Sequence, residues 1–333
     1  MMISYMTIPQ EWKQSMNMHS ATNVEPEMIN TPTPDDLKIT PRDRRFGRDA
    51  GHQPGKYWQN GDPIATAFYN SLSLTFPRGE AFFIESVKAY RDIAPKKLQK
   101  EIRAFIQQEV IHSREHLALN RRVEESGYDV SRIETRITES LDLTKVRPKI
   151  ANLAATMILE HFTAIMAQQF IADDRHWENS DEETANLWRW HALEEIEHKG
   201  VAYDTWLHAT RDWSPVRRWL IRSTFMARIS LGFVKNRTKG ILDLLAQDGY
   251  TGARARWGLF RYALVGPALL RRIFRPWMQF FKPGFHPWDI DDRHLIQLAE
   301  SKYEAAIMDS ETNRLEPVES SKPDQQDRLK KVA

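Results

Sequence analysis

The chain has 333 residues, 41% of them apolar, and a formal charge of only +2. This length and composition allow one sizeable core, and the near-neutral charge gives no case for nucleic-acid binding. The chain has no cysteine, which excludes disulfides, thiolate metal sites and a cysteine nucleophile. A metal site would therefore use His, Asp and Glu, which suit iron, manganese or zinc.

The two ends of the chain are predicted to lie outside the core. Residues 1–60 are rich in Pro, Asn, Asp and Arg without a sustained period, which predicts an extended or disordered lead-in. Residues 311–333 are similar and predict a disordered tail. No apolar run resembles a signal peptide, and none is long enough for a clean transmembrane helix. We expect a cytoplasmic protein.

The first predicted helix follows Asp62 and Pro63, a residue pair typical of a helix start. Apolar residues continue at helical spacing over 64–93, and Pro77 and Gly79 predict a kink within this helix. Pro95 then ends it.

Three further long helices are predicted over 96–125, 149–172 and 181–209. Ser180 is the expected cap of the last helix, with Glu183 completing a capping box. Residues 128–147 and 173–180 are expected to be connections. Residues 61–212 therefore predict an all-α, ferritin-like four-helix bundle.

The composition changes after residue 213. Between Ser214 and Arg275 there are 13 Lys or Arg and only two acids, Asp243 and Asp248, with aromatic residues interleaved. Residues 213–310 are thus predicted to be a basic, amphipathic helical region packed on the bundle. Such a region could also rest on anionic lipid as an interfacial helix.

Two segments carry a Glu-x-x-His motif: Glu109 with His112, and Glu195 with His198. A spacing of three places both side chains on one helix face, where they can reach one ion. A single such motif is more often a solvated helix face than a metal site. Two such motifs are a more specific sign of a metal site if the helix paired with each one carries a carboxylate at the same height.

In an antiparallel hairpin, residues equidistant from the loop centre lie at the same height. Reflection of Glu109 through a loop centre near Ala94 falls on Glu80, and reflection of Glu195 through the centre of 173–180 falls on Glu160. One Glu from each of two helices, plus a Glu-x-x-His from each of the other two, is the ligand set of ferritin-like di-metal proteins. The sequence thus predicts a di-metal site.

Other residues near these motifs leave alternatives open. His191 lies four residues before Glu195 and is a further expected ligand. His116 lies one turn beyond His112, and three roles stay open for it: a ligand, a supporting residue or part of the core lining. Glu85 is the rival to Glu80. His161 is expected to be structural, and several further carboxylates are expected to face water: Glu101, Glu115, Glu194 and Glu197.

The order of these motifs resembles that of non-haem di-iron N-oxygenases of the p-aminobenzoate N-oxygenase type. This resemblance implies a four-Glu, three-His ligand set of Glu80, Glu109, His112, Glu160, His191, Glu195 and His198. A closer resemblance, over roughly residues 40–300, is to a bacterial family labelled predicted metal-dependent hydrolases. The segments FYNSLSLTFPRGEAFF, FIQQEVIHSREHLALN and WHALEEIEHKGVAYD carry it.

Three functions follow as hypotheses. The first is an O₂-activating oxidoreductase with two metal ions, most simply iron, acting on a small organic or lipid-like substrate. The second is a two-metal hydrolase, with manganese or zinc as further options. The third is iron storage or a structural metal site. We expect no nucleic-acid partner, while a homodimer and peripheral contact with the inner membrane face stay open.

Overall fold

The computed structural model describes residues 31–47 and 54–302, and these residues form helices and no strand. The all-α prediction is therefore confirmed for the described chain. The helices are α2 (Pro63–Ser73), α3 (Phe76–Lys88), α4 (Lys96–Glu125), α5 (Ser131–Lys145), α6 (Lys149–Ala172), α7 (Glu182–His198), α8 (Val201–Ala209), α9 (Pro215–Gln247), α10 (Gly252–Leu264) and α11 (Leu269–Gln279).

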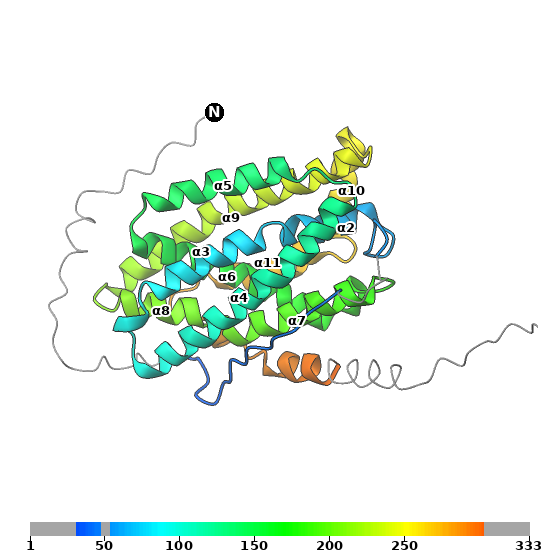
Figure 1. Cartoon of the computed structure of the whole chain (residues 1–333). Helices are drawn as coiled ribbons and strands as arrows, with labels where there is room; N and C mark the ends of the chain where they lie inside the picture. Colours follow the sequence, from blue (N-terminus) through cyan, green and yellow to red (C-terminus); the bar gives the residue numbers. More distant parts are fainter. Residues whose placement is uncertain (1–30, 48–53, 303–333) are drawn as a thin grey trace, which may run out of the picture.

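Two helical hairpins, α3 with α4 and α6 with α7, lie side by side and make up the bundle that carries the site (Figure 1). Short connections join the helices of each hairpin, containing the 3₁₀ turns Arg91–Ile93 and Asp174–His176. The predicted bounds of α4 and α6 are confirmed. This arrangement is consistent with a ferritin-like bundle.

The first predicted helix is two helices, which corrects the expected kink. Asp62 caps α2 as predicted, its carboxylate accepting the backbone N–H of Ile64 at 2.7 Å. The chain then breaks at Leu74 and Thr75, before Pro77. Pro77 falls in the first turn of α3, where a missing N–H costs nothing because that group has no partner within the helix.

The predicted helix over 181–209 also divides. Asp181, not Ser180, caps α7, and its carboxylate accepts the N–H of Thr184 at 2.8 Å. Glu183 instead accepts the backbone N–H of Gly47 at 2.8 Å. Between α7 and α8 lies Gly200, where a Cβ would come within 2.9 Å of the Trp288 ring. The break therefore allows a close approach of the C-terminal segment.

Residues 128–147 were predicted to be a connection, and this is wrong. They form α5, which lies along α9 on the outside of the bundle (Figure 1). Ile133 is the single buried residue within this helix. Ile137 and Leu141 continue the same face at helical spacing and are partly buried, so the helix covers the bundle with one narrow apolar row.

Residues 31–47, which we call the strap, are extended and lie against the bundle. Backbone N–H groups of the strap donate to buried carboxylates: Thr40 to Glu197 at 3.0 Å and Arg42 to Glu194 at 2.9 Å. The strap is thus attached to the same helix, α7, that carries part of the site. Residues 1–30 and 48–53 of the predicted lead-in 1–60 lie outside the described residues, as does the predicted tail 311–333.

Helix α6 is the core helix of the bundle. It is the one described helix long and apolar enough to cross a membrane, and 72% of its apolar window is buried inside the protein. It contacts α3, α7, α8, α9 and α11. Because its neighbours cover most of its surface, its apolar character is accounted for by the protein core.

Candidate metal centre

The bundle brings the predicted site residues into one buried cluster. Glu80 comes from α3, Glu160 from α6, and the two Glu-x-x-His motifs from α4 and α7. None of the cluster residues is more than 3% exposed: Glu80, Glu109, His112, His116, Glu160, His191, Glu195 and His198. Glu85 is not brought in, because it lies on the exposed surface of α3, 3.4 Å from Lys88.

One half of the cluster is centred on His198. Its Nε2 atom lies 3.3 Å from Glu109 Oε1, 3.3 Å from Glu160 Oε2 and 3.5 Å from Glu195 Oε2. Oxygen and nitrogen atoms from three helices therefore converge on one point. Glu109, Glu195 and His198 offer ligand atoms that all lie within 4.8 Å of one another.

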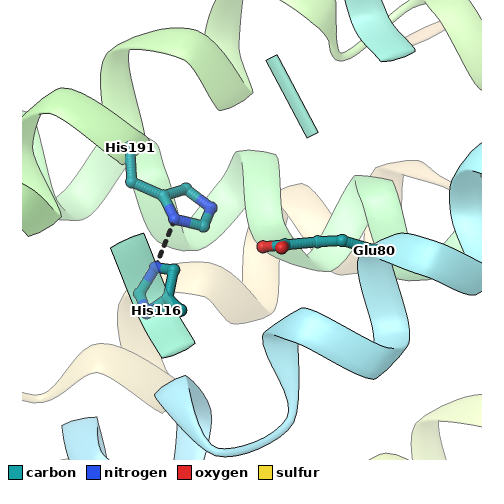
Figure 2. Close-up of side chains that lie close together, drawn as sticks. All are labelled: Glu80, His116 and His191. Carbon is teal, nitrogen blue, oxygen red and sulfur yellow. Dashed lines mark hydrogen bonds between the residues drawn. The ribbon is translucent and has the colours of Figure 1, made fainter. Parts of the chain in front are cut away.

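The other half contains His112, His191 and Glu80. His112 and His191 form one group of potential ligands with Glu195, and His112 forms another with Glu80 and Glu109. Figure 2 shows the Glu80 carboxylate directed toward the imidazoles of His191 and His116. Glu109 and Glu195 each belong to groups in both halves, as expected of residues that lie between two ions.

Many polar atoms of the cluster have no hydrogen-bond partner among the described residues. They are Glu80 Oε1, both carboxylate oxygens of Glu109 and of Glu160, Glu195 Oε2, His112 Nδ1 and His198 Nε2. Buried polar groups in proteins are normally paired, and a carboxylate left unpaired in a core is costly. Bound cations would satisfy these atoms, so the donor set fits a metal centre.

The four buried carboxylates of the cluster repel one another, so a bound cation would stabilise their charged forms. Burial, together with the neighbouring carboxylates, raises the pKa of Glu80 and Glu109 well above the ordinary range, and burial raises that of Glu160 to about 7. His198 has the opposite balance: burial lowers its pKa, but Glu195 and Glu160 outweigh burial and raise it well above its usual value. Without metal, His198 therefore tends to hold a second proton, on Nε2, and a metal cation bound there would take the place of that proton.

The outer nitrogen of each histidine is held by a hydrogen bond. His112 Nε2 lies 3.0 Å from Glu194 Oε2, and His198 Nδ1 lies 2.9 Å from Gln108 Oε1. A carboxylate only accepts, and Gln108 uses its amide N–H to reach Glu197, so both acceptors require an N–H on the outer nitrogen. In the neutral form of each ring, which is the form that binds metal, the inner nitrogens His112 Nδ1 and His198 Nε2 carry lone pairs that face the cluster.

A longer chain of hydrogen bonds orients His191. Ser73 donates its hydroxyl proton to Asn120 at 2.7 Å, so it accepts the N–H of His116 Nδ1 at 2.9 Å. His116 Nε2 then accepts from His191 Nδ1 at 2.6 Å, which leaves His191 Nε2 facing Glu195 at 2.8 Å. Both nitrogens of His116 are engaged, which favours a supporting role for it.

The expectation that Glu115, Glu194 and Glu197 face water is wrong, because each is at most 2% exposed. Arg42 of the strap binds Glu197 at 2.7 Å and Glu194 at 3.5 Å. Glu115 accepts the N–H of Phe46 at 2.9 Å. Sequence periodicity missed these partners because the strap has no periodic pattern of its own. Glu101 is partly buried.

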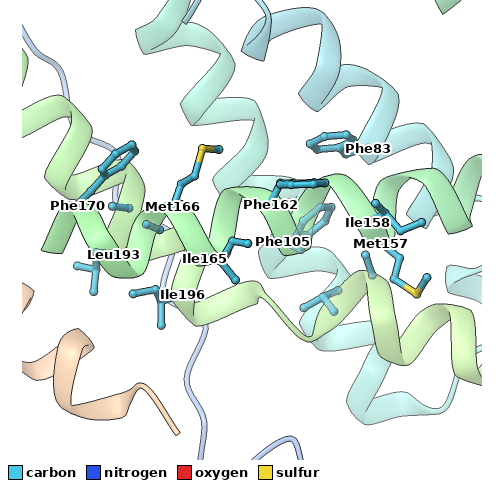
Figure 3. Packing of buried hydrophobic residues seen from close by; sticks show 14 of the residues in the cluster. Phe83, Phe105, Met157, Ile158, Phe162, Ile165, Met166, Phe170, Leu193 and Ile196 are labelled. Atoms are coloured by element: carbon cyan, nitrogen blue, oxygen red, sulfur yellow. The ribbon is translucent and has the colours of Figure 1, made fainter. Parts of the chain in front are cut away.

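Aromatic and other apolar side chains pack beside the cluster. Figure 3 shows Phe105, Phe162 and Ile165 packed between the helices that carry the site. The Phe105 ring meets His198 edge-on at 4.9 Å, and Trp190 meets His112 in the same way at 4.9 Å. His161 is not in the cluster and packs against Phe280, as expected of a structural residue. These ring contacts restrict the histidine orientations, and the cluster as a whole is buried from bulk water.

Replacement of Glu194 tests whether its hydrogen bond to His112 positions a ligand. We expect Glu194→Ala to weaken metal binding by about 10- to 100-fold, because partners of this kind orient a ligating histidine. Glu194→Gln keeps an acceptor for His112 and should restore most of the affinity. Competition with a chromophoric chelator measures both. Unchanged affinity in Glu194→Ala would mean that the contact does not position His112.

Fold and cluster together define a class: all-helical proteins with a buried carboxylate and histidine cluster suited to metal ions. The chain belongs to the family described as predicted metal-dependent hydrolase, whose family model matches residues 40–291. No curated protein and no solved structure matches the chain significantly. The predicted resemblance to this family is confirmed.

Proposed function

We propose that this protein is a hydrolase with a dinuclear metal centre. The supporting observation is the set of buried carboxylate and imidazole atoms that lack partners and converge on one region. The proposed ligands are the carboxylates of Glu80, Glu109, Glu160 and Glu195, with His112 Nδ1, His191 Nε2 and His198 Nε2. The family description supports hydrolysis as the reaction.

The chain's own residues have distinct tasks in this proposal. Two bound metal ions would supply Lewis acidity and lower the pKa of coordinated water. Glu109 and Glu195, which belong to ligand groups in both halves, would hold the two sites together. Glu194, Gln108 and His116 fix the histidine orientations, and the cluster as a whole is buried from bulk water.

An O₂-activating di-iron oxidoreductase is the second candidate. The observation that favours it is the distribution of carboxylates: one Glu from α3 and one from α6, with a Glu-x-x-His on each of α4 and α7. This is the pattern of di-iron and di-manganese carboxylate bundles. Iron would then be the resident metal, O₂ the co-substrate, and a small or lipid-like molecule the compound oxidised.

A reconstitution experiment separates the two candidates. Protein freed of metal by a chelator is reloaded with Zn²⁺, Mn²⁺ or anaerobic Fe²⁺, then assayed on chromogenic carboxylic and phosphoric esters while O₂ is monitored. We expect metal-dependent ester cleavage without O₂ uptake. O₂ uptake and a new visible absorption band with Fe²⁺, without hydrolysis under any metal, would replace the hydrolase proposal by the oxidoreductase.

A further inference from the structure

Helices α10 and α11 expose a group of large apolar side chains, which we call the α10–α11 patch. Its members are between 43% and 64% exposed: Trp257, Phe260, Val265, Leu270, Phe274 and Met278. The two helices contact each other, and Val265 lies in the segment between them. Single exposed apolar residues are common on protein surfaces, whereas several grouped on neighbouring helices are typical of an interaction surface.

In helix α11 the exposed apolar residues lie on a different face from those that pack against the bundle. Its inward face is already supplied by Leu269 and Ile273, which are buried against the bundle. Leu270, Phe274 and Met278 recur every four residues on another face, so they form an outward row along the helix. This helix therefore has one apolar side for the core and a second with no partner among the described residues.

Several exposed arginines lie on the same two helices as the patch, and one of them, Arg272, pairs with Asp173 at 3.3 Å. Arg256, Arg261, Arg271 and Arg275 are all exposed, and none forms a salt bridge with a described residue. The acids of the region are used elsewhere, Asp243 by Arg136 at 2.5 Å and Asp248 by Lys56 at 2.6 Å. The surface thus combines exposed apolar side chains with uncompensated positive charge.

This combination selects one kind of partner. A second copy of the chain in a two-fold dimer would bring the patch against itself, and its arginines would repel one another. Nucleic acid would use the positive charge but offers no apolar phase for Val265, Leu270 or Met278. The boundary of an anionic bilayer takes both: aromatic and aliphatic side chains enter the interfacial layer while arginines meet lipid phosphates.

We propose that the α10–α11 patch is a peripheral membrane-binding surface for anionic lipid. This inference rests on surface residues that take no part in the metal centre, so it stands or falls independently of the proposed function. Trp257, Phe260 and Phe274 insert at the level of the headgroups. The arginines between them set the preference for negative charge.

Vesicle co-sedimentation of the full chain tests this proposal. We expect binding to phosphatidylcholine vesicles containing 30% phosphatidylserine, weakening as salt rises, and little binding to phosphatidylcholine alone. Each basic residue near such a surface contributes about fivefold, so Arg271→Gln with Arg275→Gln should weaken binding about 25-fold. Phe274→Ser should weaken it while the salt dependence remains.

The matched control is the pair Arg103→Gln with Arg121→Gln, two exposed arginines on α4 that also lack a described carboxylate partner. This pair removes the same charge and should leave binding nearly unchanged. Equal losses from the two pairs would reduce the effect to net charge and overturn the proposal. Equal binding to neutral and anionic vesicles would also overturn it. A third contrary result is a wild-type protein that binds no vesicles and forms a dimer, which Phe274→Ser converts to a monomer.

Discussion

Glu109→Gln is expected to abolish dinuclear metal binding without unfolding the protein. The replacement keeps the size of the side chain but removes a carboxylate that belongs to ligand groups in both halves of the cluster. Loss of a residue that only hydrogen-bonds to a metal ligand lowers metal affinity about 10- to 100-fold. Loss of the ligand itself should therefore lower the affinity by more than about 100-fold. Metal titration should show at most one tight site.

The metal-free state gives this prediction a second readout. Burial and the adjacent carboxylate of Glu160 raise the pKa of Glu109, so the charged form of Glu109 is unfavourable in the absence of metal. Metal-free Glu109→Gln should therefore melt no lower than the metal-free wild type. Wild type should gain about 4 kcal/mol for each ion that it binds at free metal a thousandfold above the dissociation constant.

Glu85→Gln is the control on α3. Its carboxylate is exposed and lies beside Lys88, so the variant should bind two ions like the wild type. Equal metal loss in both variants, or full metal content in Glu109→Gln, would contradict the assignment of the cluster.

Arg42→Ala is expected to be the most destabilising single change in the strap. Arg42 is 14% exposed and binds Glu197 and Glu194, which are buried. Removal of one partner from a buried ion pair leaves uncompensated charge and costs about 3 kcal/mol or more. Chemical denaturation should show this loss, and metal affinity should fall with it because Glu194 holds His112.

The control for Arg42 is an arginine with an exposed partner. Arg91 lies 3.0 Å from Asp92, whose side chain is 83% exposed, and such surface pairs contribute less than about 1 kcal/mol. Arg91→Ala should therefore be nearly neutral. If Arg42→Ala is equally neutral, the strap does not stabilise the bundle.

Sequence reasoning reached Glu80 and Glu160 because height in an antiparallel hairpin depends only on the rise per residue. The rise is the same in every helix, so a partner carboxylate can be found by counting from the loop. The structure brings both residues into the cluster with Glu109 and His198. Counting from the loop also favours Glu80 over Glu85, and in the structure Glu80 lies in the cluster while Glu85 is exposed.

The partners of the site were not accessible in this way. Glu194 and Glu197 were predicted to face water because the strap that covers them shows no helical or strand periodicity in its sequence. The supporting role of His116 depends on Ser73, which lies on α2 and far away in the sequence. Helix α5 has only a narrow apolar row, Ile133, Ile137 and Leu141, among polar and charged residues, and the sequence analysis did not take this row as a helix.

The number of metal ions that the wild-type chain holds tests the dinuclear centre most directly. Metal-free protein is titrated with Fe²⁺ under anaerobic conditions, and with Mn²⁺ and Zn²⁺, and bound metal is counted per chain after removal of excess. We expect two ions per chain, falling to one or none in Glu109→Gln. No tightly bound ion, or a stoichiometry that Glu109→Gln leaves at two, would contradict this expectation.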